Sequence, residues 1–322
     1  MTRATAGAGT GNGPRVAVLL PCYNESAAIG QTIAAFSAVL PGATIYVFDN
    51  NSTDDSRAVA LAAGAVVRAV RQQGKGHVVR RMFADVDADI YVMADGDATY
   101  EAAAAPAMIA DMIEGDLDMV VGARKSEVEA AYRPGHVLGN RMLTGLLQGL
   151  FGRSFTDILS GYRVFSRRFV KSFPVLSAGF EIETEISVHA LELRMPVGER
   201  MTAYAARPEG SESKLSTWRD GWRILRMMIQ LYRTERPLWF FGAISAAFVV
   251  LAVVLAVPVV LTYLDTGLVP RLPTATLSLG LVILSALSLM CGLILDTVTR
   301  GRLEMRRLAY LAHPAPSAGI GN

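Results

Sequence analysis

The sequence has few residues of the kinds that build disulfide frameworks or histidine-ligated metal sites. Its 322 residues include 2 cysteines and 4 histidines. Cys22 lies near the first predicted strand and Cys291 lies in a long apolar run, which excludes a disulfide framework and a zinc cluster. The histidines are scattered along the chain, so no site with several histidine ligands is visible.

Two common phosphate-binding patterns are also missing. The run Gly74-Lys75-Gly76 lacks the GxxxxGK[ST] spacing of a P-loop, and no GxGxxG follows the first predicted strand. Any recognition of a nucleotide must therefore use another arrangement.

Charge is absent from two long runs, Leu238 to Leu264 and Thr274 to Leu295. Each run exceeds the roughly 20 residues that a bilayer-spanning helix needs. The mean hydropathy of the whole chain is +0.33, which is high for a soluble protein. We therefore predict transmembrane helices over residues 238–264 and 274–296, with Pro258 tolerated in the first.

Arginines flank the two runs on the same side of the predicted membrane. They stand before the first run and after the second, whereas the connection between the runs carries one acid and one base. This distribution places both termini and the large hydrophilic part in the cytoplasm, attached to the cytoplasmic membrane. We expect residues 1–14 to be a disordered lead and residues 297–322 to be a basic cytoplasmic tail. The arginines are Arg233, Arg236, Arg300, Arg302, Arg306 and Arg307.

Residues 216–237 have the pattern of a basic amphipathic helix. Trp218 and Trp222 share an apolar spacing with later residues, and Arg219 and Arg223 are interleaved. Such a helix, placed directly before a transmembrane segment, is typical of one that lies on the membrane surface. The alternative is an ordinary helix packed on the domain.

From Arg15 to about Gly122, short Val- and Ile-rich runs alternate with helical patterns, within a domain that we expect to span residues 15–215. This order indicates an α/β fold with a mostly parallel sheet covered on both faces. The predicted strands are 16–20, 44–48, 65–70, 90–94 and 119–122, and the predicted helices are 27–39, 54–63, 75–86 and 102–113.

Polar and acidic residues follow four successive predicted strands, and ligands of such sheets bind beyond the carboxyl ends of the strands. Asp95 and Asp97 end the fourth strand, where alternate positions share a face and favour one Mg2+ or Mn2+ with open sites for phosphate oxygens. For each motif alone, a helix cap or a turn is an adequate explanation. Their convergence on one edge favours a metal-diphosphate site.

In their order, these motifs resemble those of the family 2 glycosyltransferases with a Rossmann-like GT-A fold, in particular the polyprenyl-phosphate sugar synthases that include dolichol-phosphate mannose synthase. The resemblance covers roughly residues 16–236 and the paired apolar runs. Its motifs are Pro21 to Glu25 (PCYNE), Asp49 to Asp54 (DNNSTD), Gly74 to Gly76 (GKG), Asp95 to Asp97 (DGD), Val121 to Arg124 (VGAR), Asp157 to Arg163 (DILSGYR) and Arg207 to Lys214 (RPEGSESK).

The resemblance implies roles for the residues that match the family's motifs. A nucleotide-sugar donor is expected to bind to Pro21, Tyr23, Glu25, Asp49, Lys75, Asp95, Gly96, Asp97, Arg207 and Lys214. Asp49 would accept hydrogen bonds from the nucleobase, and Lys75 would approach the base or the diphosphate. Asp95 and Asp97 would hold the Mg2+ or Mn2+ ion, with Asp97 acting in catalysis.

The expected acceptor is a polyprenyl phosphate at the lipid bilayer. Its oxygen is already anionic at neutral pH, because the second pKa of a phosphate monoester is about 6. Arg124, Arg133 and Arg163 are candidates for binding that phosphate, since guanidinium groups suit phosphate oxygens. Asp157 is the candidate catalytic residue that orients the attack or accepts a proton, and a structural ion pair with a nearby arginine is the alternative.

Two departures from the family's motifs help to predict which nucleotide sugar is the donor. Asn50 replaces the usual second aspartate, and Ala98-Thr99-Tyr100 replaces the Leu-Gln-His of the mannose synthases. A UDP-glucose-like donor is therefore favoured, with single transfer and inversion. The alternatives are a GDP-mannose-dependent synthase, a polysaccharide synthase and an inactive membrane scaffold. We expect no nucleic-acid partner, and a homo-oligomer is compatible with the sequence.

Overall fold

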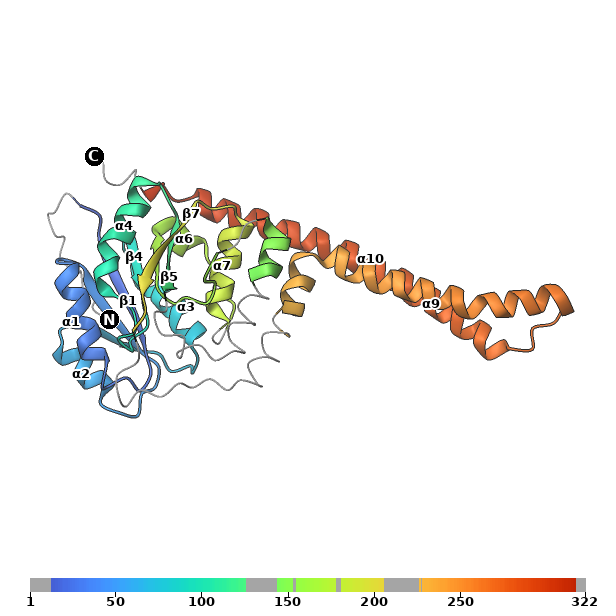
Figure 1. Cartoon of the computed structure of the whole chain (residues 1–322), viewed down its shortest axis with the longest axis horizontal. Coiled ribbons are helices and arrows are strands. Elements are labelled where there is room, and N and C mark those ends of the chain that lie inside the picture. Colours follow the sequence, from blue (N-terminus) through green and yellow to red (C-terminus); the bar gives the residue numbers. More distant parts are fainter. Residues whose placement is uncertain are drawn as a thin grey trace, which may run out of the picture. The chain divides into compact units, whose positions relative to one another are not determined.

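The computed structural model describes residues 13–125, 144–152, 155–177, 181–205, 226 and 228–316 (Figure 1). The chain divides into two compact units. The first comprises Met1–Gly221 together with Arg306–Asn322, and the second comprises Trp222–Met305. Each unit is described by itself.

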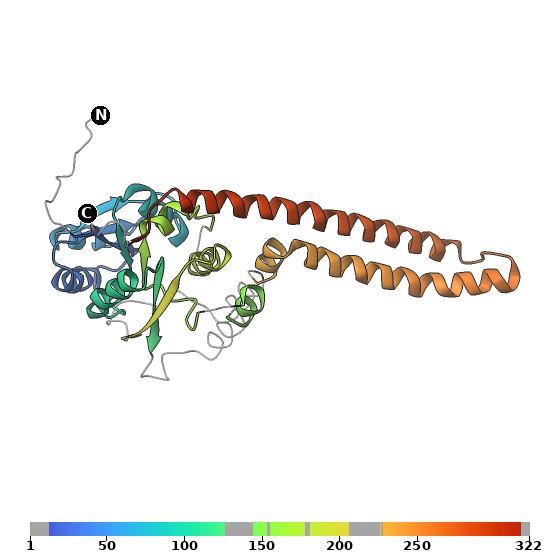
Figure 2. The ribbon, with the colours of Figure 1, turned by 90° about the horizontal axis from the view of Figure 1, so that it is seen from above.

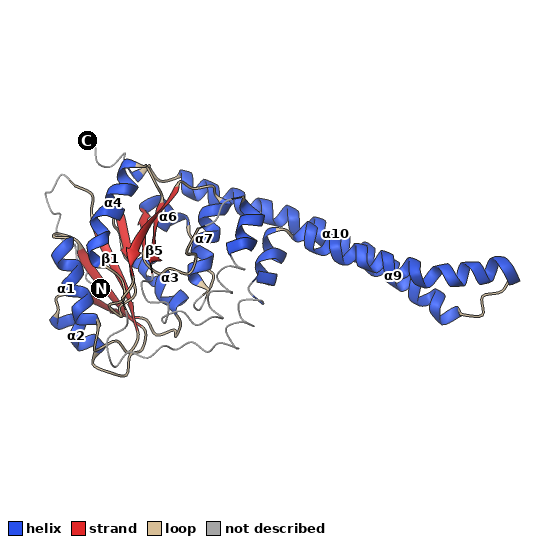
Figure 3. Cartoon of the chain, in the orientation of Figure 1, coloured by secondary structure: helices blue, strands red, loops and turns tan. Residues whose placement is uncertain are grey.

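A seven-stranded sheet forms the centre of the first unit, in the order β3-β2-β1-β4-β6-β5-β7 (Figure 3). β1 pairs in parallel with β2 and β4, and β2 pairs in parallel with β3. β6 runs antiparallel to β4 and β5, whereas β5 and β7 are parallel. The strands are β1 Val16–Cys22, β2 Thr44–Asp49, β3 Val66–Ala69, β4 Ile90–Met93, β5 Met119–Lys125, β6 Arg163–Ser166 and β7 Val197–Ala203.

The strand order reverses direction at β1. The chain moves from β1 to β2 to β3 toward one edge, and then returns to place β4 on the other side of β1. Because crossovers between parallel strands are right-handed, this reversal puts the helix after β3 on the opposite face of the sheet from the helices after β1 and β2. The carboxyl ends of β1 and β4 flank the reversal point, which is where open α/β sheets bind their ligands.

Helices occupy both faces of this sheet. α1 contacts α2 and α4, and α3 contacts α6 and α7. α1 buries Ile29, Ile33 and Phe36 against the sheet, at the spacing expected for one face of a helix. The helices are α1 Ile29–Val39, α2 Ser56–Ala62, α3 Lys75–Asp85, the short 3-10 helix η1 Ala102–Ala104, α4 Ala105–Glu114, α6 Arg167–Ser172 and α7 Ile182–Glu192.

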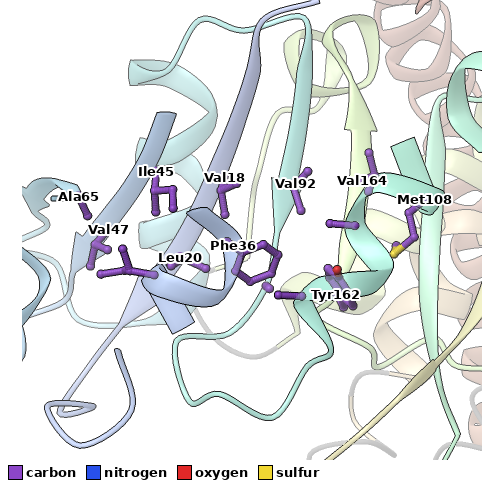
Figure 4. Packing of buried hydrophobic residues seen from close by; sticks show 14 of the residues in the cluster. Val18, Leu20, Phe36, Ile45, Val47, Ala65, Val92, Met108, Tyr162 and Val164 are labelled. Carbon is purple, nitrogen blue, oxygen red and sulfur yellow. The ribbon is translucent and has the colours of Figure 1, made fainter. Parts of the chain in front are cut away.

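One large apolar cluster lies between the sheet and the helices of the α1 side (Figure 4). Val18 and Leu20 project from β1 into this cluster, and Val92 projects from β4. The ring of Phe36 meets the ring of Tyr162 edge to face, with centroids 6.1 Å apart. Leu19, on the opposite face of β1, is also buried, which is why this strand reads as a continuous apolar run.

The sequence predicted the mostly parallel sheet and the two long apolar helices, and both predictions are confirmed. It missed β6, α6 and β7, which follow the regular βα repeat. β6 has only four residues and begins with Arg163, so it does not resemble a buried strand. β7 is exposed at alternate positions and lies at the edge of the sheet.

The second unit contains most of the two long helices, which run antiparallel to each other (Figure 2). α9 spans Pro237–Thr266 and α10 spans Leu272–Leu311, and both are long and apolar enough to cross a membrane. The hydroxyls of Ser245 and Ser285 lie 2.8 Å apart across the pair. A Cβ on Gly292 would meet the Cβ of Phe241 at 3.1 Å. Small residues thus bring the two helices close, as in membrane helix pairs.

The last turns of α10 belong to the first unit. Arg306 forms an ion pair with Glu192 at the end of α7. The hydroxyl of Tyr310 donates to the fully buried Asp118, with an O to O distance of 2.8 Å. Residues 297–311 of the predicted tail are part of α10 and are helical. Polar contacts of Arg306 and Tyr310 anchor the end of this helix.

His189, on α7, is buried among aromatic rings and predicts a pH-dependent stability. It is 1% exposed, and its Nε2 lies 3.2 Å from the hydroxyl of Ser172. Burial, with a smaller contribution from the charge of Arg306, lowers the pKa of His189 to about 3. The imidazole is therefore neutral in the folded protein, whereas in the unfolded chain it takes up a proton below its ordinary pKa of about 6.5.

We expect the stability of the detergent-solubilised protein to fall as the pH is lowered from 6.5 towards 3, because only the unfolded state gains this proton. Thermal unfolding at pH 7.5 and pH 5 measures the effect. His189→Phe should show a smaller loss between these two pH values, and His313→Phe, which changes a half-buried histidine, should behave like the wild type. An unchanged pH dependence in His189→Phe would contradict this account.

Candidate active site

The carboxyl ends of β1 and β2 lie side by side. Cys22 pairs with Asp49 in the register of the two strands. Asp49 is 6% exposed, and its Oδ1 accepts a hydrogen bond from the backbone N–H of Ser52 at 3.2 Å. The loop after β1 is tied to the start of α2, because the N–H of Glu25 donates to the hydroxyl of Ser56 at 2.8 Å.

Asp95 and Asp97 lie beyond β4 in a turn. β4 ends at Met93, so the sequence argument that both carboxylates share one face of a strand was wrong. Asp97 is 4% exposed, and its Oδ1 accepts a hydrogen bond from the Thr99 hydroxyl at 2.6 Å. The turn, rather than the pleat of a strand, sets the direction of each carboxylate.

Gly96 brings this turn against the end of β1 and the start of α1. A Cβ at position 96 would lie 3.1 Å from the carbonyl oxygen of Pro21 and 3.0 Å from Ile29, closer than ordinary side chains approach. The hydroxyl of Thr32 donates to the carbonyl of Gly96 at 3.3 Å. Two motifs that the sequence singled out separately, at Pro21 and at Gly96, are therefore in contact.

Lys75 binds two carboxylates from different parts of the chain. Its Nζ lies 2.5 Å from Oδ1 of Asp95 and 2.6 Å from Oε1 of Glu183, on α7. Burial by itself would lower the pKa of Lys75, but the charges of Asp95 and Glu183 outweigh burial and raise that pKa above its ordinary value. The ammonium group is therefore charged and held as a shared counter-ion.

Asp95 is also enclosed by the segment that precedes β6. A Cβ on Gly161 would lie 2.9 Å from Oδ2 of Asp95, so only glycine allows this approach. The N–H of Gly161 donates to the hydroxyl of Tyr100 at 2.9 Å. Burial, followed by the negative charge of Asp95, raises the pKa of Tyr100 and keeps its hydroxyl protonated.

Arg124 and Asp157 form a two-pronged ion pair near this edge. Nε of Arg124 lies 2.6 Å from Oδ2 of Asp157, and Nη2 lies 2.8 Å from Oδ1. The guanidinium also lies over the ring of Tyr204, 5.4 Å from its centroid. Of the two sequence interpretations of Asp157, the structure displays the ion pair with an arginine.

Arg163 is not placed to bind an acceptor phosphate. Its side chain is fully buried, and its guanidinium donates to the carbonyls of Ser160 at 2.9 Å and Ile158 at 2.6 Å. Burial lowers the pKa of Arg163 to about 10. Arg163 thus fixes the backbone between Asp157 and β6, and the prediction that it binds the acceptor phosphate was wrong.

Several predicted site residues lie outside the described part of the chain. They are Arg133, Arg207 and Lys214, together with residues 216–225 and 227 of the predicted interfacial helix 216–237 and nearly all of the lead 1–14. Tyr23 and Glu25 lie half-buried in the loop after β1, and their binding roles stay predictions.

Glu183 is the contact that sequence reasoning left unresolved. The run Glu181, Glu183, Glu185 predicted that one carboxylate would support the site, and the alternation did not identify which one. In the structure Glu183 is 5% exposed and binds Lys75, whereas Glu185 binds the hydroxyl and N–H of Ser177. The sequence singled out Lys75, but its partner on α7 could be identified only from the fold.

The residues at this edge fit a divalent cation only with help from a substrate. Among the residues that the structure describes, no group of three or more His, Cys, Asp or Glu side chains is arranged to hold a metal ion. Asp95 binds Lys75, and Asp97 is the candidate metal ligand in the turn after β4. Mg2+ is commonly held by one or two carboxylates plus substrate phosphates, so this sparse donor set suits a metal that arrives with a diphosphate.

Residues 17–173 match the family model described as Glycosyl transferase family 2. Glycosyltransferase AglJ of Haloferax volcanii is 32% identical, and the match covers 92% of this chain and 98% of that relative. Dolichyl-phosphate hexose transferase of the same organism is 24% identical over 69% of this chain and 95% of its own length.

The fold is also similar to a solved structure. Glucosyl-3-phosphoglycerate synthase from Mycobacterium tuberculosis, in complex with Mn2+, UDP-glucose and phosphoglyceric acid, matches with a TM-score of 0.52 and 25% identity. This match covers 61% of the chain and 73% of that structure. Since a named glycosyltransferase aligns along nearly the whole chain and the family model covers its sheet up to α6, the chain belongs to glycosyl transferase family 2.

Proposed function

We propose that this glycosyltransferase is membrane-bound and transfers one hexose, with inversion, from a nucleotide sugar of the UDP-glucose type to a polyprenyl phosphate on the cytoplasmic leaflet. The observation that carries the proposal is the convergence of Asp49, Asp97 and the Lys75 cluster at one sheet edge, in a chain with two membrane-length helices. The membrane-surface helix at 216–237 and the domain 15–215 are parts of the same proposal.

The donor would lie along the carboxyl ends of β1, β2 and β4. We assign the nucleobase to Asp49 and the diphosphate to the turn that holds Asp97, because Asp49 ends β2 and the turn follows β4, the two strands on either side of β1. The UDP-glucose complex of a protein with a similar fold supports this donor class.

The diphosphate needs a counter-charge, and two cations near this edge of the sheet are already paired with carboxylates. Lys75 is held by Asp95 and Glu183, and Arg124 is held by Asp157. A Mg2+ or Mn2+ ion bound at Asp97 would supply electrostatic stabilisation of the departing nucleoside diphosphate. Asp97 would orient that end of the donor, and the Thr99 hydroxyl would fix the carboxylate of Asp97.

In the reaction, an oxygen of the acceptor phosphate forms a bond to the anomeric carbon. The bond from that carbon to the diphosphate oxygen breaks, and the nucleoside diphosphate leaves with the electron pair. The acceptor oxygen is anionic at neutral pH, so no strong base is required. We therefore propose that Asp157 orients Arg124 towards the acceptor phosphate, with Arg133 as a further candidate.

The membrane location follows from the chemistry of the acceptor. The resemblance to a dolichyl-phosphate hexose transferase supports a lipid phosphate, and α9 and α10 would keep the site at the bilayer. The arginines before α9 and in the last part of α10 favour cytoplasmic termini.

We expect the purified protein to form a chloroform-soluble product when it is incubated with Mg2+, undecaprenyl phosphate and one radiolabelled donor. The donors to compare are UDP-glucose, GDP-mannose and UDP-N-acetylhexosamine, with UDP-glucose expected to label the lipid most. Label transfer from GDP-mannose alone would identify the alternative synthase, and a polymeric product would identify a polysaccharide synthase. No lipid-linked label from any donor would contradict the proposal.

Asp97→Ala should reduce turnover by about a hundredfold or more, because electrostatic stabilisation of the leaving group is typically worth that much. Asp265→Ala, at an exposed carboxylate near the end of α9, is the matched control and should stay fully active. Initial rates at saturating donor and Mn2+ are the measurement, with thermal unfolding to check that both variants fold. Wild-type activity in a folded Asp97→Ala protein would remove this carboxylate from the mechanism.

A further inference from the structure

Asn50 occupies the place where the resembling motif has an aspartate, and the structure gives a reason for the amide. The residue is 4% exposed and follows directly after β2. The hydrogen bonds of its side-chain amide reach the backbone of one segment, Val70–Gly74, which joins β3 to α3. Nδ2 donates to the carbonyls of Val70 at 3.1 Å and Gln72 at 2.7 Å, and Oδ1 accepts from the N–H of Gly74 at 2.7 Å.

These contacts require a side chain that both donates and accepts. The amide of asparagine supplies two N–H donors and one carbonyl acceptor, and the three hydrogen bonds here use both donors and the acceptor. An ionised aspartate has nearly the same shape but offers acceptors only. Its second oxygen would face two backbone carbonyls in a buried place, which would leave them without donors and add repulsion.

The segment that Asn50 holds connects two parts of the candidate site. At its beginning, the N–H of Val70 donates to the backbone carbonyl of Asp49 at 2.8 Å. At its end, Gly74 has a φ of 131°, a conformation that favours glycine, and α3 starts at the next residue, Lys75. The position of Gly74 therefore determines where Lys75 enters the space between Asp95 and Glu183.

We propose that Asn50 is a positioning residue for nucleotide binding: its amide fixes Val70–Gly74 as a wall of the donor pocket between Asp49 and Lys75. The inference rests on the proposed function, because it assigns the ligand of this wall to a nucleoside diphosphate. Its effect is on the affinity for the donor. Once a donor fills the pocket, the two ion pairs of Lys75 hold the other end of the segment, so turnover at saturation is largely preserved.

Asn50→Asp tests the polarity of this amide with almost no change in volume. Calorimetric titration of the full-length protein with UDP in the presence of Mn2+ should show a Kd at least about tenfold weaker than that of the wild type, as expected when buried hydrogen bonds are lost. In the transfer assay, the KM for the donor should rise by a similar factor. The kcat should change by less than about threefold, a separation that general loss of folded protein would not produce.

Asn51→Asp is the matched control, because the neighbouring side chain also donates to this segment but is exposed to water. Its Nδ2 reaches the carbonyl of Arg71 at 2.9 Å and the side chain of Gln73 at 3.1 Å. Water can replace these contacts, so the Kd for UDP should change by less than about threefold.

Gly74→Ala is a second variant, which strains the backbone at the end of the segment Val70–Gly74 and leaves the side chain of Asn50 unchanged. It should also weaken UDP binding. If Asn50→Asp does not fold, Gly74→Ala carries the test, and undiminished UDP binding by that variant overturns the inference. Equal UDP affinity in folded Asn50→Asp and wild-type protein also overturns it. A wild-type protein that binds neither UDP nor GDP would overturn the proposed function and the inference together.

Discussion

The ammonium group of Lys75, shared between Asp95 and Glu183, is the interaction on which the candidate site depends. It joins the start of α3, the turn after β4 and the first turn of α7, three separate parts of the sequence. A largely buried carboxylate pair without this cation would be costly, since each charge would lose its hydration without a partner. The pairing therefore fixes the geometry of Asp95 and, through the turn, that of Asp97.

The same ion pair explains why the site needs a positive charge that the protein does not supply itself. The described basic side chains nearest the turn are bound to carboxylates, as Lys75 is to Asp95 and Arg124 is to Asp157. A nucleoside diphosphate brings further negative charge, which favours a divalent cation entering with it. The proposed acceptor is also an anion, so the protein's task in this account is to position and neutralise rather than to remove a proton.

The sequence predicted the repeat of strands and helices because apolar periodicity is a local property. It also predicted that the strand ends would converge, because the carboxyl ends of parallel strands share one edge. It did not predict β6, whose first residue is a buried arginine that bonds to backbone carbonyls. Nor could it choose Glu183 among three alternating glutamates, or assign Arg163 to the interior, because both depend on contacts between distant segments.

In the proposed mechanism, Asp97 binds the divalent ion while the ion pair between Lys75 and Asp95 stays intact. A crystal structure of the protein with UDP and Mn2+, with anomalous scattering recorded for manganese, tests it most directly. We expect a manganese peak at coordination distance, about 2 Å, from a carboxylate oxygen of Asp97 and from a diphosphate oxygen. Lys75 should still be bound to Asp95 and Glu183. A manganese ion bound to Asp95 with Lys75 displaced, or bound UDP with no manganese beside it, would contradict the account.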